Sequence, residues 1–198
     1  MSTTTTTAAP AAAPSIAVIF HSGYGHTQKI AQAVAEGVGQ GAALIVIDAE
    51  GNLPEGAWDT LAAARSIVFG SPTYMGSVSW QFKKFADASS KVWFSQGWAG
   101  KLFAGFTNSA SLNGDKHSTL HYFITLAMQH SGLWVGTGMM PANTKASTRA
   151  DVNNLGSYAG LMTATPSDAS TDEMVAGDLA TAQAFGAHLA AVTAGLKA

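Results

Sequence analysis

Four continuous runs of β-branched and aromatic residues alternate with segments of helical periodicity, and this alternation constrains the fold more than any other feature of the chain. The runs cover residues 16–20 (IAVIF), 44–47 (LIVI), 66–69 (SIVF) and 102–106 (LFAGF). Continuous apolar runs of this length are typical of strands that are buried on both faces of a parallel sheet. A shorter apolar run at 133–135 predicts a fifth strand.

The segments between and after these runs have the apolar spacing of helices that bury one face. The apolar stripes are Ile30, Val34 and Val38; Phe82, Phe85 and Ala86; Leu120, Ile124 and Met128; and Phe185, Leu189, Val192 and Leu196. Ser170 or Thr171 is expected to cap the closing helix, which the pattern predicts over 171–196. Strands that alternate with helices favour right-handed crossovers. We therefore expect an α/β fold with a doubly wound, five-stranded parallel sheet and helices on both faces.

The length of 198 residues fits one domain, and the 47% of hydrophobic residues supply a sizeable core. Residues 1–14 are low-complexity Thr, Ala and Pro, and we expect them to be disordered. The folded domain is then expected over 15–198. Residues 136–168 are rich in Gly, Asn, Thr and Ser without a clear period, and a connection of this length is usually functional.

Charge and residue usage exclude several classes of protein. The net charge of -2 comes without the basic cluster that nucleic-acid binding requires. The chain has no cysteine and its six histidines lack the HExxH spacing, so we expect no metal site. The N-terminus lacks the basic and apolar regions of a signal peptide, and no run reaches the roughly 18 apolar residues of a membrane span. We therefore expect a cytoplasmic protein, and the low charged fraction of 11% indicates a homo-oligomer, either a dimer or a tetramer.

Polar, glycine-containing turns follow the first, third and fourth predicted strands, where ligands bind in doubly wound sheets. The first turn, residues 21–27 (HSGYGHT), opens a helix. Free N–H groups and the helix dipole favour an anion there, Ser22 and Thr27 add hydroxyl donors, and Gly23 and Gly25 allow close approach of the backbone. The turn matches neither GxxxxGK[ST] nor GxGxxG, so it predicts a phosphomonoester site. The alternative is a simple strand-to-helix turn capped by a serine.

The turns after the third and fourth strands offer a flat surface and a polar edge. Pro72 stiffens the earlier turn, and Gly76 permits a backbone conformation barred to larger residues. Thr73, Tyr74 and Met75 then present a hydroxyl, an aromatic ring and a thioether to a flat ligand. The later turn (TNSASLNGD) presents small polar side chains and backbone donors that suit a pyrimidine-like ring. The alternative for the earlier turn is an ordinary surface loop with chance aromatic content.

Several of these motifs, in the same order along the chain, resemble the flavodoxin superfamily. The likeness includes the first loop, SPTYMG at 71–76, the following QFKKFAD at 81–87 and the segment from Leu155, and it extends over roughly 15–196. Within the superfamily the chain most resembles the WrbA-like NAD(P)H:quinone oxidoreductases. The resemblance implies a flavodoxin-like strand order of 2-1-3-4-5, non-covalently bound FMN, and NADH or NADPH as co-substrate.

The same resemblance implies roles for individual residues. The loop that binds the FMN phosphate corresponds to Ser22, Gly23, Tyr24, Gly25, His26 and Thr27. The loop along the isoalloxazine corresponds to Pro72, Thr73, Tyr74, Met75 and Gly76. The loop at the polar edge of the ring corresponds to Thr107, Asn108, Ser109, Ala110, Ser111 and Gly114. Trp93 matches an aromatic residue that the family offers to the flavin site of a neighbouring subunit, and His130 matches a histidine that completes the pocket.

The resemblance predicts a two-electron oxidoreductase, an FMN-dependent NAD(P)H dehydrogenase (quinone). NAD(P)H would transfer a hydride to flavin N5, and a quinone would then accept both electrons in the same pocket, which predicts ping-pong kinetics. His130 is the candidate to supply or relay a proton, although it could instead cap helix carbonyls. Trp93 could be an interface anchor as well as a wall of the site. The alternative functions are a one-electron carrier of the flavodoxin type and a non-catalytic FMN-binding protein.

Overall fold

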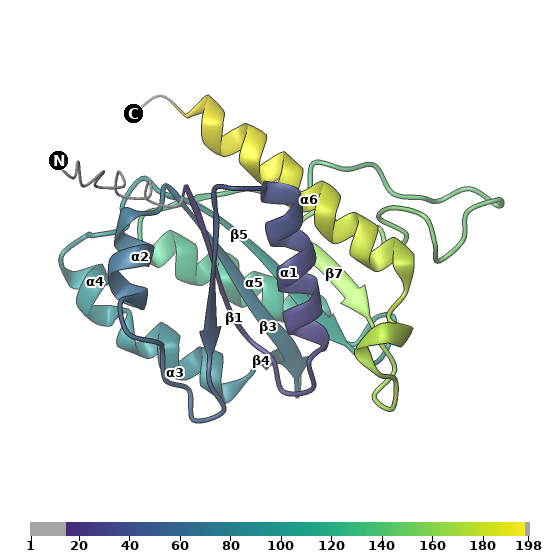
Figure 1. Ribbon diagram of the computed structural model, residues 1–198, viewed down its shortest axis with the longest axis horizontal. Coiled ribbons are helices and arrows are strands. Elements are labelled where there is room, and N and C mark those ends of the chain that lie inside the picture. Colours follow the sequence, from purple (N-terminus) through teal and green to yellow (C-terminus); the bar gives the residue numbers. More distant parts are fainter. Residues whose placement is uncertain (1–14, 197–198) are drawn as a thin grey trace, which may run out of the picture.

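The runs predicted as buried strands are neighbours in one parallel sheet (Figure 1). The computed structural model describes residues 15–196, so the disorder expected for residues 1–14 lies outside the described residues. The parallel strands are β1 (Ile16–His21), β2 (Ala42–Ile47), β3 (Ser66–Tyr74), β5 (Leu102–Ser109) and β6 (Leu133–Trp134). Their order, β2-β1-β3-β5-β6, is the flavodoxin-like order that was predicted as 2-1-3-4-5. This prediction is confirmed.

Two short strands share the last position of the sheet, which corrects the prediction of a single fifth strand at 133–135. β6 pairs with Leu102 and Phe103 at the beginning of β5, and β7 (Leu161–Ala164) pairs with the end of β5. Between β6 and β7 the chain leaves the sheet and returns. The sequence pattern does not predict β7, because four residues inside a Gly-, Ser- and Thr-rich stretch carry little periodic signal.

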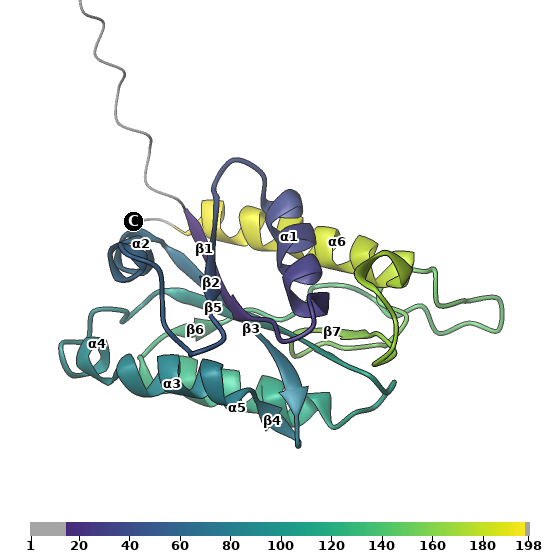
Figure 2. The same ribbon diagram turned by 60° about the horizontal axis from the view of Figure 1, so that its bottom comes forward.

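Helices cover both faces of the sheet, and each face has its own core. α1 (His26–Val38) and α6 (Ala176–Gly195) pack on one face, side by side in Figures 1 and 2. α2 (Ala57–Ala63), α3 (Trp80–Ala88) and α5 (Lys116–Gln129) contribute to the core on the other face. Ile16 and Val18 of β1 enter the α1–α6 core, whereas the intervening Ala17 enters the opposite core. The continuous apolar run of β1 follows from this alternation, because every residue of the strand is buried. The prediction of a buried strand at 44–47 is partly wrong: β2 lies at the edge of the sheet, where Leu44 and Val46 are exposed and only Ile45 and Ile47 are buried.

Three smaller elements complete the fold. β4 (Ser77–Val78) forms an antiparallel hairpin with the end of β3, and α4 (Ser90–Phe94) follows α3 directly. The closing helix begins at Ala176 instead of 171, because the capping box of Ser170 and Glu173 closes a separate 3-10 turn, η1 (Thr171–Glu173). None of the helices within residues 15–196 combines the length and hydropathy needed to cross a lipid bilayer.

The predicted apolar stripe of α5 is partly wrong. Leu120 is buried as expected, but Ile124 is only half-buried and Met128 is exposed. The buried partners of Leu120 are Phe123 and Ala127. Because a helix turns about 100° per residue, Phe123 and Ala127 lie about 60° and 20° to one side of Leu120, whereas Ile124 and Met128 lie about 40° and 80° to the other side. Leu120 therefore lies at one edge of the buried face, and Ile124 and Met128 lie beyond that edge.

Candidate functional site

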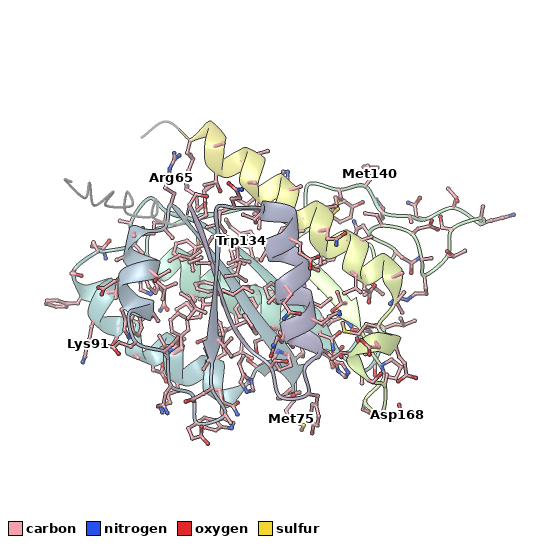
Figure 3. All side chains as sticks on the ribbon, viewed as in Figure 1. Arg65, Met75, Lys91, Trp134, Met140 and Asp168 are labelled. Carbon is pink, nitrogen blue, oxygen red and sulfur yellow. The ribbon has the colours of Figure 1, made fainter. Side chains whose placement is uncertain are left out.

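The loops that follow β1, β3, β5 and β7 meet at the carboxyl edge of the sheet and line a cavity of about 150 Å³. The lining residues are Tyr24, His26, Thr27, Pro72, Thr73, Tyr74, Asn108, Ser109, Ala110, Thr165 and Ser167. Figure 3 shows Met75 and Asp168, from two of these loops, at this edge and Arg65 at the opposite edge. None of the lining residues is acidic, so the cavity suits an anionic ligand.

Helix α1 begins at the cavity, and backbone amides of its first turn have no hydrogen-bond acceptor within the helix. Its N-cap residue, Gly25, has a φ of 88° and no side chain to cap the helix. Ser22 Oγ accepts the N–H of Gln28 at 3.2 Å, so this serine satisfies one amide of the first turn, although it is not the N-cap residue. The amides of His26 and Thr27 have no intrahelical acceptor, as at the start of any helix. The positive end of α1 therefore presents free donors to the cavity, which favours a bound anion.

The ring of His26 is already engaged by the chain that follows β7. Its Nε2 lies 2.8 Å from the carbonyl oxygen of Ala169, so it donates a hydrogen bond that holds this segment against α1. The backbone N–H of His26, and not its imidazole, remains available to a ligand. Across residues 15–196, no group of three or more His, Asp or Glu side chains lies together as a metal site would require.

Tyr74 closes the first loop from the side of β3. A Cβ atom on Gly23 would lie 2.5 Å from the Tyr74 hydroxyl, so a larger residue there would displace the tyrosine ring. The rings of Tyr24 and Tyr74 meet edge to face with centroids 6.4 Å apart. Burial is the main cause that raises the pKa of Tyr74, and the nearby Tyr24 adds to the effect. The two rings therefore form a neutral aromatic wall of the cavity.

Met75 and Gly76 form the two-residue turn of the β3–β4 hairpin, where both have positive φ values, 48° and 77°. Met75 is fully exposed, and neither residue lines the cavity. The structure thus brings Pro72, Thr73 and Tyr74 of the predicted second loop to the cavity, but not Met75 or Gly76.

The end of β5 contributes a buried hydroxyl network and one amide. Thr107 is fully buried, and its hydroxyl lies 2.8 Å from that of Thr73, beneath the cavity instead of on its wall. Asn108 Oδ1 accepts hydrogen bonds from Thr163 at 2.8 Å and Thr165 at 3.1 Å. These two bonds orient the amide, and no side chain or carbonyl among the described residues accepts from its NH2 group. Asn108 therefore offers a fixed donor at the wall.

Of the remaining residues of the predicted third loop, some line the cavity and others do not. Ser109 and Ala110 line the cavity, whereas Ser111 and Gly114 do not. Gly114 has a φ of 54°, and a Cβ atom there would overlap the Ser109 hydroxyl. The glycine is thus required for the loop to fold back over Ser109.

A fourth loop, which the sequence pattern did not reveal, completes the cavity with Thr165 and Ser167. It follows β7 directly, at 161–168 (LMTATPSD). The polar turn after a short, partly apolar segment is the one signal that could have indicated this loop. That signal is weak because Thr163 interrupts the apolar residues of β7.

Trp93 and His130 lie away from the cavity of their own chain. His130 follows the last residue of α5, whose 14 residues place it roughly 20 Å from Lys116 at the cavity end. Figure 2 shows α4, which carries Trp93, and the β4 hairpin at the two ends of α3. Trp93 and His130 instead line a second cavity of about 240 Å³ between α4 and α5, together with Ser89 and Gln129.

Comparisons with known proteins agree with this architecture. Residues 15–146 match the family described as NADPH-dependent FMN reductase. The chain is 57% identical over 175 residues to "Flavodoxin FldP" of Pseudomonas aeruginosa, covering 88% of this chain and 94% of that protein. It is 30% identical over 205 residues to an "NAD(P)H dehydrogenase (quinone)" of Trichlorobacter lovleyi, covering 92% and 98%.

A solved structure supports the same grouping. The flavodoxin, WrbA-like protein from Agrobacterium tumefaciens superposes with a TM-score of 0.76 at 51% identity, covering 92% of this chain and 98% of that one. A flavodoxin from the domain Archaea, at 17% identity and a TM-score of 0.58, shares the fold. The resemblance to flavodoxin-like oxidoreductases is therefore confirmed, and the chain belongs to the NADPH-dependent FMN reductase family.

Proposed function

We propose that this protein is an FMN-dependent NAD(P)H dehydrogenase (quinone) and that the carboxyl-edge cavity holds the FMN. One observation carries the proposal: the free amides at the start of α1, the aromatic wall of Tyr24 and Tyr74, and the oriented amide of Asn108 surround a single cavity. Relatives at about 30% identity bear the name NAD(P)H dehydrogenase (quinone), which supports the reaction class.

The residues of the cavity fit the groups of FMN. The free amides of His26 and Thr27 suit the dianionic phosphate, and no carboxylate lines the cavity to repel it. The NH2 group of Asn108 suits a carbonyl oxygen at the polar edge of the ring. The neutral rings of Tyr24 and Tyr74 suit a flat aromatic surface. Ser22, Gly23 and Gly25 would shape the phosphate loop, as the resemblance implies.

FMN would supply the redox chemistry, accepting a hydride at N5 from NADH or NADPH and returning two electrons to a quinone. The protein would bind the phosphate, orient the ring and exclude water from it. The buried hydroxyl chain of Thr73, Thr107 and Thr119 serves the second task, because its two 2.8 Å contacts tie the ends of β3 and β5 to α5. No side chain of the cavity is needed as a nucleophile.

We assign Trp93 and His130 to the cofactor site of a second copy of the chain, since they lie far from the cavity of their own chain. Trp93 and Phe94 are 47% and 84% exposed on α4, which suits an interface between copies. The low charged fraction of 11% also supports a homo-oligomer. Trp93→Ala is expected to shift sedimentation toward smaller species and to change bound-flavin fluorescence. Unchanged values for both would contradict this assignment.

The proposal is tested first by binding FMN to the apoprotein and recording its absorption and fluorescence. Thr27→Glu places a carboxylate at the start of α1, and we expect it to weaken FMN binding at least about a hundredfold by repulsion. Thr125→Glu is the matched control, because Thr125 is exposed on α5, and it should bind FMN like the wild type. Equal affinity of both variants would refute the phosphate site.

A one-electron carrier is the second candidate, favoured by the 57% identity to a protein named flavodoxin. Stopped-flow mixing of the FMN-loaded protein with NADH or NADPH separates the two functions. Rapid bleaching by two electrons, followed by reoxidation with a quinone, supports the dehydrogenase. Absence of reduction by either nucleotide, together with a long-lived one-electron-reduced state under chemical titration, supports the carrier.

A further inference from the structure

Lys116, the first residue of α5, is a buried cation beside the cavity that the proposed function does not use. Its side chain has no exposed surface. Its Nζ donates to Ser109 Oγ at 2.8 Å, to the carbonyl oxygen of Ser111 at 2.7 Å and to that of Leu112 at 2.9 Å. An ammonium group has three N–H donors, so each of them has an acceptor in the loop between β5 and α5.

These hydrogen bonds determine in which direction the carbonyl and N–H groups of the loop point. The carbonyls of Ser111 and Leu112 point inward to the ammonium. Because each peptide is planar and trans, the N–H groups of Leu112 and Asn113 point to the opposite side. Both residues are exposed, and none of the described residues accepts a hydrogen bond from either amide. The loop thus displays two consecutive free donors on its outer surface.

The charge of Lys116 has no directly bonded counter-ion. Among the described residues its ammonium contacts no carboxylate, and Asp178 is already paired with Arg149 at 2.9 Å. Burial lowers the pKa of Lys116 to about 8; the carboxylate of Asp178 opposes this shift, and the guanidinium of Arg149 adds to it. At neutral pH the side chain therefore still carries its proton. A positive charge of this kind favours additional negative charge on a nearby ligand.

We propose that Lys116 is a positioning residue that holds the loop between β5 and α5, with the cavity-lining Ser109 and Ala110, at the polar edge of the ligand. Its charge also stabilises the more negative form of the ligand. The second part rests on the proposed function. A hydride from NAD(P)H adds two electrons and one proton to the ring, so the net charge of the ring becomes more negative by one. Lys116 thus binds the reduced cofactor in preference to the oxidised one and raises its reduction potential.

Lys101 offers a matched control elsewhere in the same chain. Its Nζ donates to the carbonyl oxygens of Ala62 and Ala64 at the end of α2, near the amino edge of the sheet. Lys101 is only partly buried, but like Lys116 it donates to backbone carbonyls, and burial lowers its pKa as well. Lys101→Met therefore removes a comparable group without touching the cavity.

The first test uses the apoprotein, so that its result does not depend on the cofactor. In Lys116→Met the loop loses its central donor, and we expect the NMR order parameters of residues 110–114 to fall. Lys116→Gln keeps a neutral donor and serves if Lys116→Met fails to fold. Lys101→Met should leave these order parameters unchanged. Unchanged order in both Lys116 variants would overturn the positioning role.

The second test measures the dissociation constants of oxidised and reduced FMN. Both Lys116 variants should weaken binding of the reduced form about tenfold more than that of the oxidised form, which lowers the two-electron potential by about 30 mV. A ratio within twofold of the wild-type value would overturn the electrostatic role. Failure of the wild type to bind FMN would refute the proposed function and this electrostatic role, whereas the order parameters of the apoprotein still decide the positioning role.

Discussion

The Nε2 atom of His130 lies 2.9 Å from the Ser89 hydroxyl, and that hydroxyl donates its own proton to the Ala86 carbonyl oxygen at 2.7 Å. Ser89 Oγ must therefore accept from His130, so Nε2 carries the proton of the ring. The Nδ1 atom is then an acceptor, and it is buried without a partner among the described residues. Burial lowers the pKa of His130. The histidine is thus a neutral ring with one unused acceptor.

The burial of this neutral ring predicts how the free energy of unfolding depends on pH. Because the folded pKa of His130 is lowered below 6.5, the unfolded chain binds more protons than the native chain just below that pH. The free energy of unfolding should therefore fall as the pH drops from about 6.5, and burial of His21 acts in the same direction. Urea unfolding at several pH values should show a shallower decline for His130→Phe than for wild type.

His117→Phe is the control for this measurement, because His117 is exposed on the same helix. It should retain the wild-type decline. Nitrogen-15 NMR of the wild type should also show a protonated Nε2 and an unprotonated Nδ1 at pH 7. An Nδ1-protonated ring would contradict the hydrogen-bond assignment.

The close packing of α1 against α6 depends on glycines. A Cβ atom on Gly186 would overlap the Val34 carbonyl oxygen, and one on Gly37 would overlap that of Gln183. Gly186→Ala should lower the free energy of unfolding by about 1–3 kcal/mol, since the helices must move apart. Gly195→Ala, where a Cβ meets nothing within 4 Å, should be neutral or slightly stabilising. Chemical denaturation measures the free energy of unfolding of both variants. Equal stability of the two would contradict the close packing of α1 against α6.

Asp178 joins the segment between β6 and β7 to the start of α6. Its Oδ2 accepts from Arg149 Nη2 at 2.9 Å and from the Ala164 amide at 2.8 Å. Asp178→Ala leaves both donors unsatisfied and should cost about 2–4 kcal/mol of stability. Limited proteolysis should then cut within 140–158 earlier than in wild type. The exposed pair Lys83–Asp87 is the control, and Asp87→Ala should change stability by less than about 0.5 kcal/mol.

The β3–β4 turn carries a residue that its conformation disfavours. Met75 has a φ of 48°, in the left-handed region where asparagine and glycine are favoured. Met75→Asn should therefore raise the free energy of unfolding by up to about 1 kcal/mol. Met140→Asn is the control, since Met140 is an exposed methionine without a positive φ. A gain at Met140 equal to that at Met75 would indicate a general surface effect instead of relieved strain.

The sequence by itself determined the sheet and most of the loops that line the carboxyl-edge cavity. Strands buried on both faces need unbroken apolar runs, and the runs at 16–20, 66–69 and 102–106 are such strands in the structure, while the run at 44–47 is the edge strand. The order of the strands was implied by the resemblance to the flavodoxin superfamily. The loops that carry Thr27, Tyr74 and Asn108 follow from the same pattern, because parallel strands bring their carboxyl ends to one edge. These features depend on local composition and spacing, which a single chain displays directly.

The tertiary structure alone decided where several residues act. Pairing with β5 is what makes residues 161–164 a strand, and this pairing brings Thr165 and Ser167 to the cavity. The length of α5 places His130 at the far end of this helix, whose first residue lies beside the cavity. Lys116 resembles an ordinary surface lysine in the sequence. It is buried because the carbonyls of Ser111 and Leu112 converge on its ammonium, and that convergence exists only in the folded loop.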